Sequence, residues 1–136
     1  MLKLPAALAA ELRAQGQRAY PEECCGVLLG RARGDTREVV EARACANARA
    51  GTRDRYAIAP GELIAAQRAA RERGLELLGF YHSHPDHPPE PSATDRVEAY
   101  WEGSSYVIVS VTRGQADDLR SFVLRGGRFE AESVTP

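Results

Sequence analysis

The chain has little cysteine, almost no net charge and no long apolar run, and each shortage excludes a class of protein. Its 136 residues carry a formal net charge of −1, so no strong attraction to nucleic acid or to an anionic membrane is expected. The odd count of 3 cysteines argues against a disulfide framework. No apolar stretch approaches the roughly 20 residues that cross a bilayer. The sequence therefore predicts a cytoplasmic protein without a nucleic-acid or membrane partner.

The rest of the composition is that of one globular domain. Hydrophobic residues make up 43% and charged residues 27% of the chain, so residues 1–136 are expected to form a single domain with its own core. The apolar start is interrupted by Glu11 and Arg13, which favours a first helix over a signal peptide. The sequence leaves open whether Cys45 forms a disulfide with Cys24 or Cys25, because these segments could be neighbouring strands.

The apolar periodicity predicts an α/β domain whose mixed, mostly antiparallel sheet is flanked by helices. Leucines recur every four residues in the first helix, and β-branched runs indicate buried strands. A second helix is expected to bury a face made of Leu63, Ile64, Ala66 and Ala70. In chain order, the expected elements are a helix Pro5–Ala19, strands Cys24–Leu29 and Thr36–Ala44 around a turn Gly30–Asp35, a loop Asn47–Asp54, a short strand Arg55–Ala59, a helix Pro60–Arg73, a strand leading into the histidines from Leu77, a helix Ala93–Trp101, a strand Tyr106–Val111, and a closing hairpin of Leu119–Leu124 and Arg128–Val134.

One short stretch holds every histidine of the chain, namely His82, His84 and His87. The apolar run Leu77–Tyr81 leads into it and predicts a buried strand. Because side chains alternate along a strand, His82 and His84 should point to the same face. Pro85 then ends the regular pairing, since it has no N–H to donate. Two imidazoles on one face of a strand are typical of the beginning of a metal site.

A third ligand is available in Asp95. The segment Ser92-Ala-Thr-Asp95 has the form of a helix start, with Ser92 as the N-cap and an acidic residue three positions later. In the helix that follows, Val97, Tyr100 and Trp101 have helical spacing for burial. Two imidazoles and one carboxylate leave a fourth position for water, which is the usual plan of a catalytic zinc site.

The spacing of these residues resembles a known motif. His82-x-His84-Pro85, six residues, Ser92, two residues and Asp95 match the JAMM motif of the JAB1/MPN zinc metalloprotease family, and its short bacterial members are the most similar. The family also has an upstream glutamate at the start of a strand, which Glu23 matches. The resemblance implies a curved sheet related to the cytidine deaminase core. It also implies one Zn²⁺ per chain, held by His82, His84 and Asp95.

The resemblance also implies roles for the other polar residues. Glu23 is the expected general base, which takes a proton from water activated by zinc and passes it to the leaving amine. Ser92 is expected to donate a hydrogen bond to the carbonyl oxygen, or only to cap its helix. His87, Asp86 and Glu90 are expected to be solvated loop residues, with Asp86 orienting a ligand imidazole as a lesser alternative.

The family resemblance implies amide hydrolysis, often after the C-terminal Gly-Gly of ubiquitin-like proteins. The segments between the motifs are short, which favours a sulfur-carrier protein as the partner. Such a tail could be gripped as an added strand near the histidine strand and the loop Asn47–Asp54. The oligomeric state stays open, with a homodimer as one option.

Three other functions fit the sequence less well. A non-catalytic scaffold that binds a ubiquitin-like partner is disfavoured by the complete ligand set. A DNA-associated relative of the RadC group is disfavoured by the near-neutral charge and the lack of an added helix-hairpin-helix region. A zinc deaminase would need a His-x-Glu and a Pro-Cys-x-x-Cys pair, and neither occurs.

Overall fold

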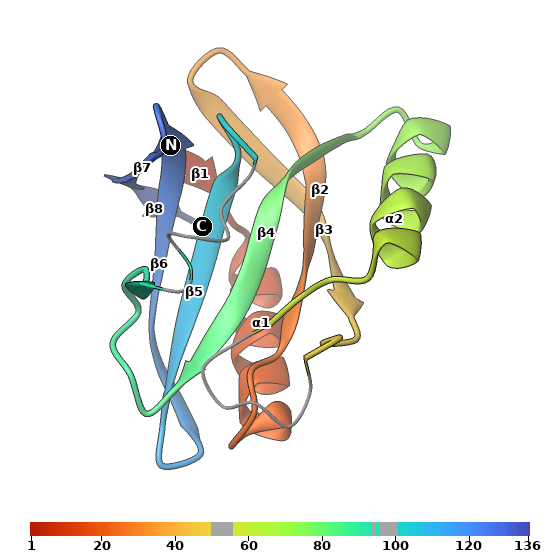
Figure 1. The fold of residues 1–136 in the computed structure, drawn as a ribbon. Coiled ribbons are helices and arrows are strands. Elements are labelled where there is room, and N and C mark those ends of the chain that lie inside the picture. Colours follow the sequence, from red (N-terminus) through yellow and green to blue (C-terminus); the bar gives the residue numbers. More distant parts are fainter. Residues whose placement is uncertain (50–55, 94, 96–100) are drawn as a thin grey trace.

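A mixed sheet of eight strands organises the part of the chain that the computed structural model describes, residues 1–49, 56–93, 95 and 101–136 (Figure 1). The strand order is β7-β6-β5-β4-β2-β3-β1-β8, and the sheet curves around helix α1. Adjacent pairs are parallel for β1–β3, β1–β8 and β4–β5, and antiparallel for the others. The elements are β1 Leu2–Lys3, α1 Ala6–Ala19, β2 Cys25–Arg33, β3 Thr36–Cys45, α2 Pro60–Glu72, β4 Glu76–Pro85, β5 Ser105–Thr112, β6 Gln115–Arg125, β7 Arg128–Glu132 and β8 Val134–Thr135.

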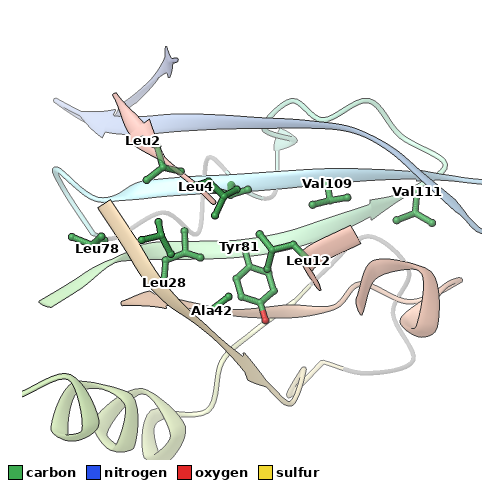
Figure 2. Packing of buried hydrophobic residues seen from close by; sticks show 11 residues of the cluster. Leu2, Leu4, Leu12, Leu28, Ala42, Leu78, Tyr81, Val109 and Val111 are labelled. Atoms are coloured by element: carbon green, nitrogen blue, oxygen red, sulfur yellow. The ribbon is translucent and has the colours of Figure 1, made fainter. Parts of the chain in front are cut away.

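The two helices cover opposite faces of the sheet. Under α1, Leu12 packs with Tyr81 and with the valines of β5 that point to this face, and all of them are buried (Figure 2). Under α2, Ala66 and Ala70 pack against residues such as Phe80. Tyr81 and Phe80 are neighbours on β4, so the alternation of a strand sends them to different faces. The predicted α/β class and the flanking helices are therefore confirmed.

The prediction that Ile64 belongs to the buried face of the second helix is wrong. Ala66 and Ala70 are buried, but Ile64 is 55% exposed. Residues two apart on a helix point about 200° away from each other, so Ile64 cannot share the face that Ala66 presents to the sheet. The small alanines let α2 lie close to the strands, and the larger Ile64 stays on the outer side.

The first hairpin has the predicted strands but a later turn. β2 continues to Arg33, so the turn is at Gly34 and Asp35 and does not begin at Gly30. Gly30 lies where the pairing with β3 shifts register. A Cβ at this position would lie 1.9 Å from the carbonyl oxygen of Glu38. Gly30 therefore permits a close approach within the sheet, a use of glycine that looks like a turn signal in the sequence.

The two ends of the chain meet in the sheet, which the sequence pattern did not predict. The closing hairpin is formed by β6 and β7, but Val134 belongs to β8, which pairs in parallel with β1. The side chain of Glu132 holds this corner by accepting hydrogen bonds from Ser105 Oγ and Ser121 Oγ, each at 2.6 Å. Strands of two residues carry no periodicity, so only the tertiary pairing reveals them.

Some predicted elements fall outside the described residues. Of the predicted helix Ala93–Trp101, positions 94 and 96–100 are not described, and Trp101 is not helical. Of the predicted loop and short strand from Asn47 to Ala59, positions 50–55 are not described, while Asn47 and Ile58 form an isolated antiparallel bridge. Among the described helices, neither is long and apolar enough to cross a membrane.

Candidate metal centre

The two histidines of β4 lie together as predicted. His82 and His84 are 1% and 4% exposed, and their Nε2 atoms are 3.1 Å apart. The strand is held on both sides, by β2 and by β5. Ser83, between the histidines, accepts a hydrogen bond at Oγ from the backbone N of Cys24 at 2.8 Å and donates its own N–H to the Cys24 carbonyl. The start of β2 thus fixes the part of β4 that carries both imidazoles.

Asp95 lies beside the histidines and is held there by two hydrogen bonds with Ser92. Its Oδ2 lies 3.3 Å from Nε2 of His82 and 3.0 Å from Nε2 of His84. Asp95 N donates to Ser92 Oγ at 3.0 Å, and Ser92 N donates to Asp95 Oδ2 at 2.8 Å. This reciprocal pair is the hydrogen-bond pattern of a capping box with aspartate as the acid. Most of the helix that it would cap lies outside the described residues, so the capping role of Ser92 stays a prediction. The carboxylate oxygen that accepts the Ser92 N–H also faces the two imidazoles.

The three converging atoms fit a divalent metal ion. The triangle formed by the two Nε2 atoms and Asp95 Oδ2 has edges of 3.0–3.3 Å. Ligands at about 2.0–2.1 Å from a tetrahedral ion lie roughly 3.3 Å from each other. His84 Nδ1 must donate to the carbonyl oxygen of Pro88, at 2.8 Å, because a carbonyl can only accept. In the neutral ring this leaves the lone pair of Nε2 directed at the triangle, as a metal ligand requires.

The charge states also suit a cation. Burial lowers the pKa of His82, since it disfavours the imidazolium form, and the nearby Asp95 only partly offsets this. Burial also opposes ionisation of Asp95, but hydrogen bonds with His82 and His84 dominate and hold the pKa of its carboxyl below the usual range. A neutral imidazole and an ionised carboxylate are the forms that bind metal.

Glu23 joins this group from the start of β2. It is 3% exposed, and ligand atoms of Glu23, His82 and His84 all lie within 4.8 Å of one another. Its backbone carbonyl accepts a hydrogen bond from Asn47 Nδ2 at 3.1 Å. The structure therefore brings together four of the predicted site residues, with Asp95 Oδ2 3.3 Å from Nε2 of His82 and 3.0 Å from Nε2 of His84.

The three cysteines, Cys24, Cys25 and Cys45, are all free thiols. Cys25 pairs with Cys45 across β2 and β3 and with His82 across β2 and β4, so the predicted neighbourhood of these segments is confirmed. Burial raises the pKa of the Cys25 thiol to about 12, which keeps it protonated at neutral pH. The disulfide that the sequence left open is not formed.

A pocket of about 240 Å³ opens beside the metal-binding triangle. His82 and Asp95 are among the residues that line it. Much of the rest of the lining is aromatic, with ring centroids 5.4 Å apart for Phe80 and Trp101 and 5.2 Å apart for Tyr106 and Phe129. Trp101, expected either in the core or at a groove rim, lines this pocket. A substrate segment seated here would lie against the predicted metal ligands.

His87 and Asp86 lie in the loop that follows β4, and they make different contacts. His87 is exposed, with its ring centroid 6.5 Å from that of His84, as expected for a solvated loop residue. Asp86 does not orient a ligand imidazole, so that lesser alternative is wrong. It accepts hydrogen bonds from the Tyr20 hydroxyl at 2.7 Å and from Arg113 N at 2.8 Å, which ties the loop to its neighbours.

Sequence reasoning missed Tyr56. Its ring stacks on that of His82 with centroids 4.3 Å apart and planes 19° apart. Burial raises the pKa of its phenol well above the ordinary value, so the hydroxyl stays neutral beside Asp95 and Glu23. A single aromatic residue between a polar segment and a helix start carries no periodic signal. Its closeness to the histidines appears only in the folded chain.

The fold and the site together define a class. A mixed sheet flanked by two helices presents two strand histidines, the Asp95 carboxylate and a glutamate just before an adjacent strand, which is the arrangement of a JAB/MPN-type domain with a candidate metal centre. The chain belongs to the prokaryotic homologues of the JAB domain, because that family matches residues 5–125. The predicted resemblance is therefore confirmed.

Several proteins similar in sequence to this chain are named as hydrolytic enzymes. The chain is 43% identical to a desampylase of Haloferax volcanii over 90 residues, which are 66% of this chain and 63% of that protein, so the match spans less than two thirds of the relative. It is 35% identical to a probable TtuB-protein conjugate cleaving protease of Thermus thermophilus, over 94% of this chain and 79% of the other. It is 30% identical to a CysO-cysteine peptidase of Mycobacterium bovis, over 98% and 90%.

A solved structure agrees with the fold over the whole chain. The solution structure of a protein from Desulfitobacterium hafniense superimposes with a TM-score of 0.88 at 30% identity, covering 98% of this chain and 91% of the other.

Proposed function

We propose that the protein is a cytoplasmic zinc-dependent isopeptidase that hydrolyses amide bonds after the C-terminal Gly-Gly of ubiquitin-like or sulfur-carrier proteins. The observation that carries the proposal is the convergence of His82 Nε2, His84 Nε2 and Asp95 Oδ2 within 3.0–3.3 Å, with the Glu23 carboxylate close to the two imidazoles. Three ligands and a separate carboxylate are the parts that metal-assisted amide hydrolysis needs.

The metal would be held by His82, His84 and Asp95. Zinc bound by three protein ligands keeps an open position and supplies a Lewis acid that lowers the pKa of water and polarises a carbonyl. The chain itself holds these side chains in place, since β4 is paired on both sides and Asp95 is held by its two hydrogen bonds with Ser92. Such preorganisation favours an ordered site over a loose surface cluster.

Glu23 is assigned the proton transfer. Its carboxylate would accept a proton from the attacking water and give it to the leaving nitrogen, which makes the amine a better leaving group. Its side chain is buried beside the imidazoles and within reach of the same reacting atoms. Asp95 is less suited to carry this proton, because it is itself a proposed metal ligand.

Ser92 is assigned a hydrogen bond to the substrate. Its Oγ accepts the N–H of Asp95, and a hydroxyl still has its own proton to donate. A donor aimed at the carbonyl oxygen stabilises the negative charge that develops there during attack. One residue can thus anchor Asp95 and assist the reaction.

The substrate assignment combines the pocket with the relatives. A Gly-Gly tail has no side chains and can enter a narrow space beside the metal ligands, and the pocket that borders His82 and Asp95 offers such a space. The named relatives include a probable TtuB-protein conjugate cleaving protease and a CysO-cysteine peptidase. We therefore propose a carrier protein whose tail is linked to a lysine, to cysteine or to a short peptide.

The test is intact-mass spectrometry of a sulfur-carrier-type protein that extends past its Gly-Gly. It is incubated with the wild-type chain with and without a chelator, and with Glu23→Gln and the matched control Glu22→Gln. The proposal predicts cleavage after the second glycine that the chelator and Glu23→Gln abolish and Glu22→Gln leaves intact. Zinc binding without cleavage of any such substrate would instead indicate a scaffold.

A further inference from the structure

The two proposed histidine ligands are held in different ways. His84 donates from Nδ1 to the Pro88 carbonyl at 2.8 Å, which fixes its ring and leaves Nε2 for the metal. His82 Nδ1 is buried but has no hydrogen-bond partner among the described residues. A metal-ligating histidine ordinarily donates its other ring N–H to an acceptor that sets its orientation. His82 must be oriented by another contact.

That contact is the ring of Tyr56. The two rings are nearly parallel, 19° apart, with centroids 4.3 Å from each other. The second side-chain torsion of histidine is broad, so an imidazole can swing out of line unless packing restrains it. A flat face against a fully buried His82 restrains this swing. The stack can therefore do for His82 what the Pro88 carbonyl does for His84.

Tyr56 is itself anchored to the backbone next to Glu23. Asn47 Oδ1 accepts the N–H of Ala57 at 3.0 Å, while Asn47 Nδ2 donates to the carbonyl of Glu23 at 3.1 Å. The carbonyl of Ala57 accepts from Ala48 N at 2.7 Å. One amide side chain thus joins the backbone of the proposed base to the residue that follows Tyr56.

We propose that Tyr56 is a positioning residue that orients His82 through its ring face, with Asn47 as its anchor. The inference rests on the part of the proposed function that makes His82 a metal ligand, and it adds two residues that are not themselves proposed ligands. It assigns the effect to the aromatic face, since the stack needs no hydroxyl.

The test measures the zinc dissociation constant of the full chain by competition with a chromophoric chelator. Tyr56→Ala is expected to weaken zinc binding by about 10–100-fold, the range known for contacts that orient metal ligands. Tyr56→Phe is expected to restore wild-type affinity because it keeps the ring. Trp101→Ala is the matched control and should keep wild-type affinity, since it removes an aromatic side chain of the same pocket whose ring packs at a tilt of 57° against Phe80. Circular dichroism checks that each variant is folded.

Asn47→Ala tests the anchor. It should weaken zinc binding in the same direction as Tyr56→Ala, and the double variant should lose little more than the single ones, because both changes release the same stack. Nitrogen-15 spectra of the imidazoles report directly on His82, whose signals should broaden or split in Tyr56→Ala without metal and stay sharp in Tyr56→Phe.

The outcomes separate the inference from the proposed function. Tyr56→Ala with wild-type zinc affinity, or Tyr56→Phe as weak as Tyr56→Ala, would overturn the positioning role while the metal centre stands. Additive losses in the double variant would remove Asn47 as the anchor. A wild-type chain that binds no zinc would overturn the metal centre and the positioning role together.

Discussion

The two faces of the sheet differ in kind although the same strands build both. The face under α1 is filled mainly by aliphatic side chains around Tyr81, whose hydroxyl is satisfied by Gln15 at 2.6 Å. The face under α2 carries aromatic residues, a pocket, and the buried groups Glu23, His82 and His84. Tyr81 and His82 are adjacent in sequence, so their side chains point to opposite faces of β4. Tyr81 points into the core under α1, and His82 points into the candidate metal site. Changes on the two faces should therefore affect different measurements.

The largest expected effect on hydrolysis comes from His84→Ala. This change removes a proposed ligand and leaves only two, so both bound zinc and cleavage should be lost while the α1 face keeps the chain folded. Inductively coupled plasma mass spectrometry and the cleavage assay measure this. His87→Ala is the control on the exposed loop and should keep both. One zinc per chain in His84→Ala would contradict the ligand assignment.

Glu23→Gln is expected to lower kcat by roughly 10²–10⁴-fold, the contribution of a positioned general base. Glutamine has almost the same shape as glutamate, so the structure around His82 should persist in this variant. Steady-state kinetics give kcat and KM separately, and the loss should fall on kcat. A variant with wild-type kcat would remove Glu23 from the proton-transfer role.

Ser92→Ala should have a smaller effect, on the order of 10²-fold in kcat, from the loss of one donor to the carbonyl oxygen. The lost cap should also reduce the free energy of unfolding by about 1 kcal/mol. Kinetics and thermal unfolding of the same sample separate the two. An unchanged kcat with reduced stability would leave Ser92 with capping alone.

Leu12→Ala should have the smallest effect on hydrolysis and sharpens the comparison from the other face. It truncates a fully buried side chain under α1 and should lower the free energy of unfolding by about 2–5 kcal/mol. Zinc affinity and kcat of the folded protein should stay within about twofold, since distant sites act independently. Leu8→Ala, at a partly buried position, is the control and should cost less.

Local patterns in the sequence predicted much of the fold and most of the site. The strand alternation placed His82 and His84 on one face, and the helix-start pattern paired Asp95 with Ser92. These predictions succeeded because each depends on residues close in sequence. The predicted hydrolytic enzyme also agrees with the names of the relatives.

The missed features depend on contacts between distant segments. Gly30 permits an approach to β3, and the pairing of β8 with β1 joins the two ends of the chain. The partner of His84 is a backbone carbonyl, that of Pro88, whose position no side-chain pattern encodes. Tyr56 lies 26 positions before His82 and meets it only after folding. Such contacts have no period in the sequence.

The central claim is that Asp95, and not Glu23, completes the ligand set. It is tested most directly by measuring zinc per chain in Glu23→Gln and Asp95→Ala, purified side by side with the wild type. One zinc in the wild type and in Glu23→Gln, with little or none in Asp95→Ala, is the predicted result. Zinc retained in Asp95→Ala and lost in Glu23→Gln would contradict it and make Glu23 the third ligand.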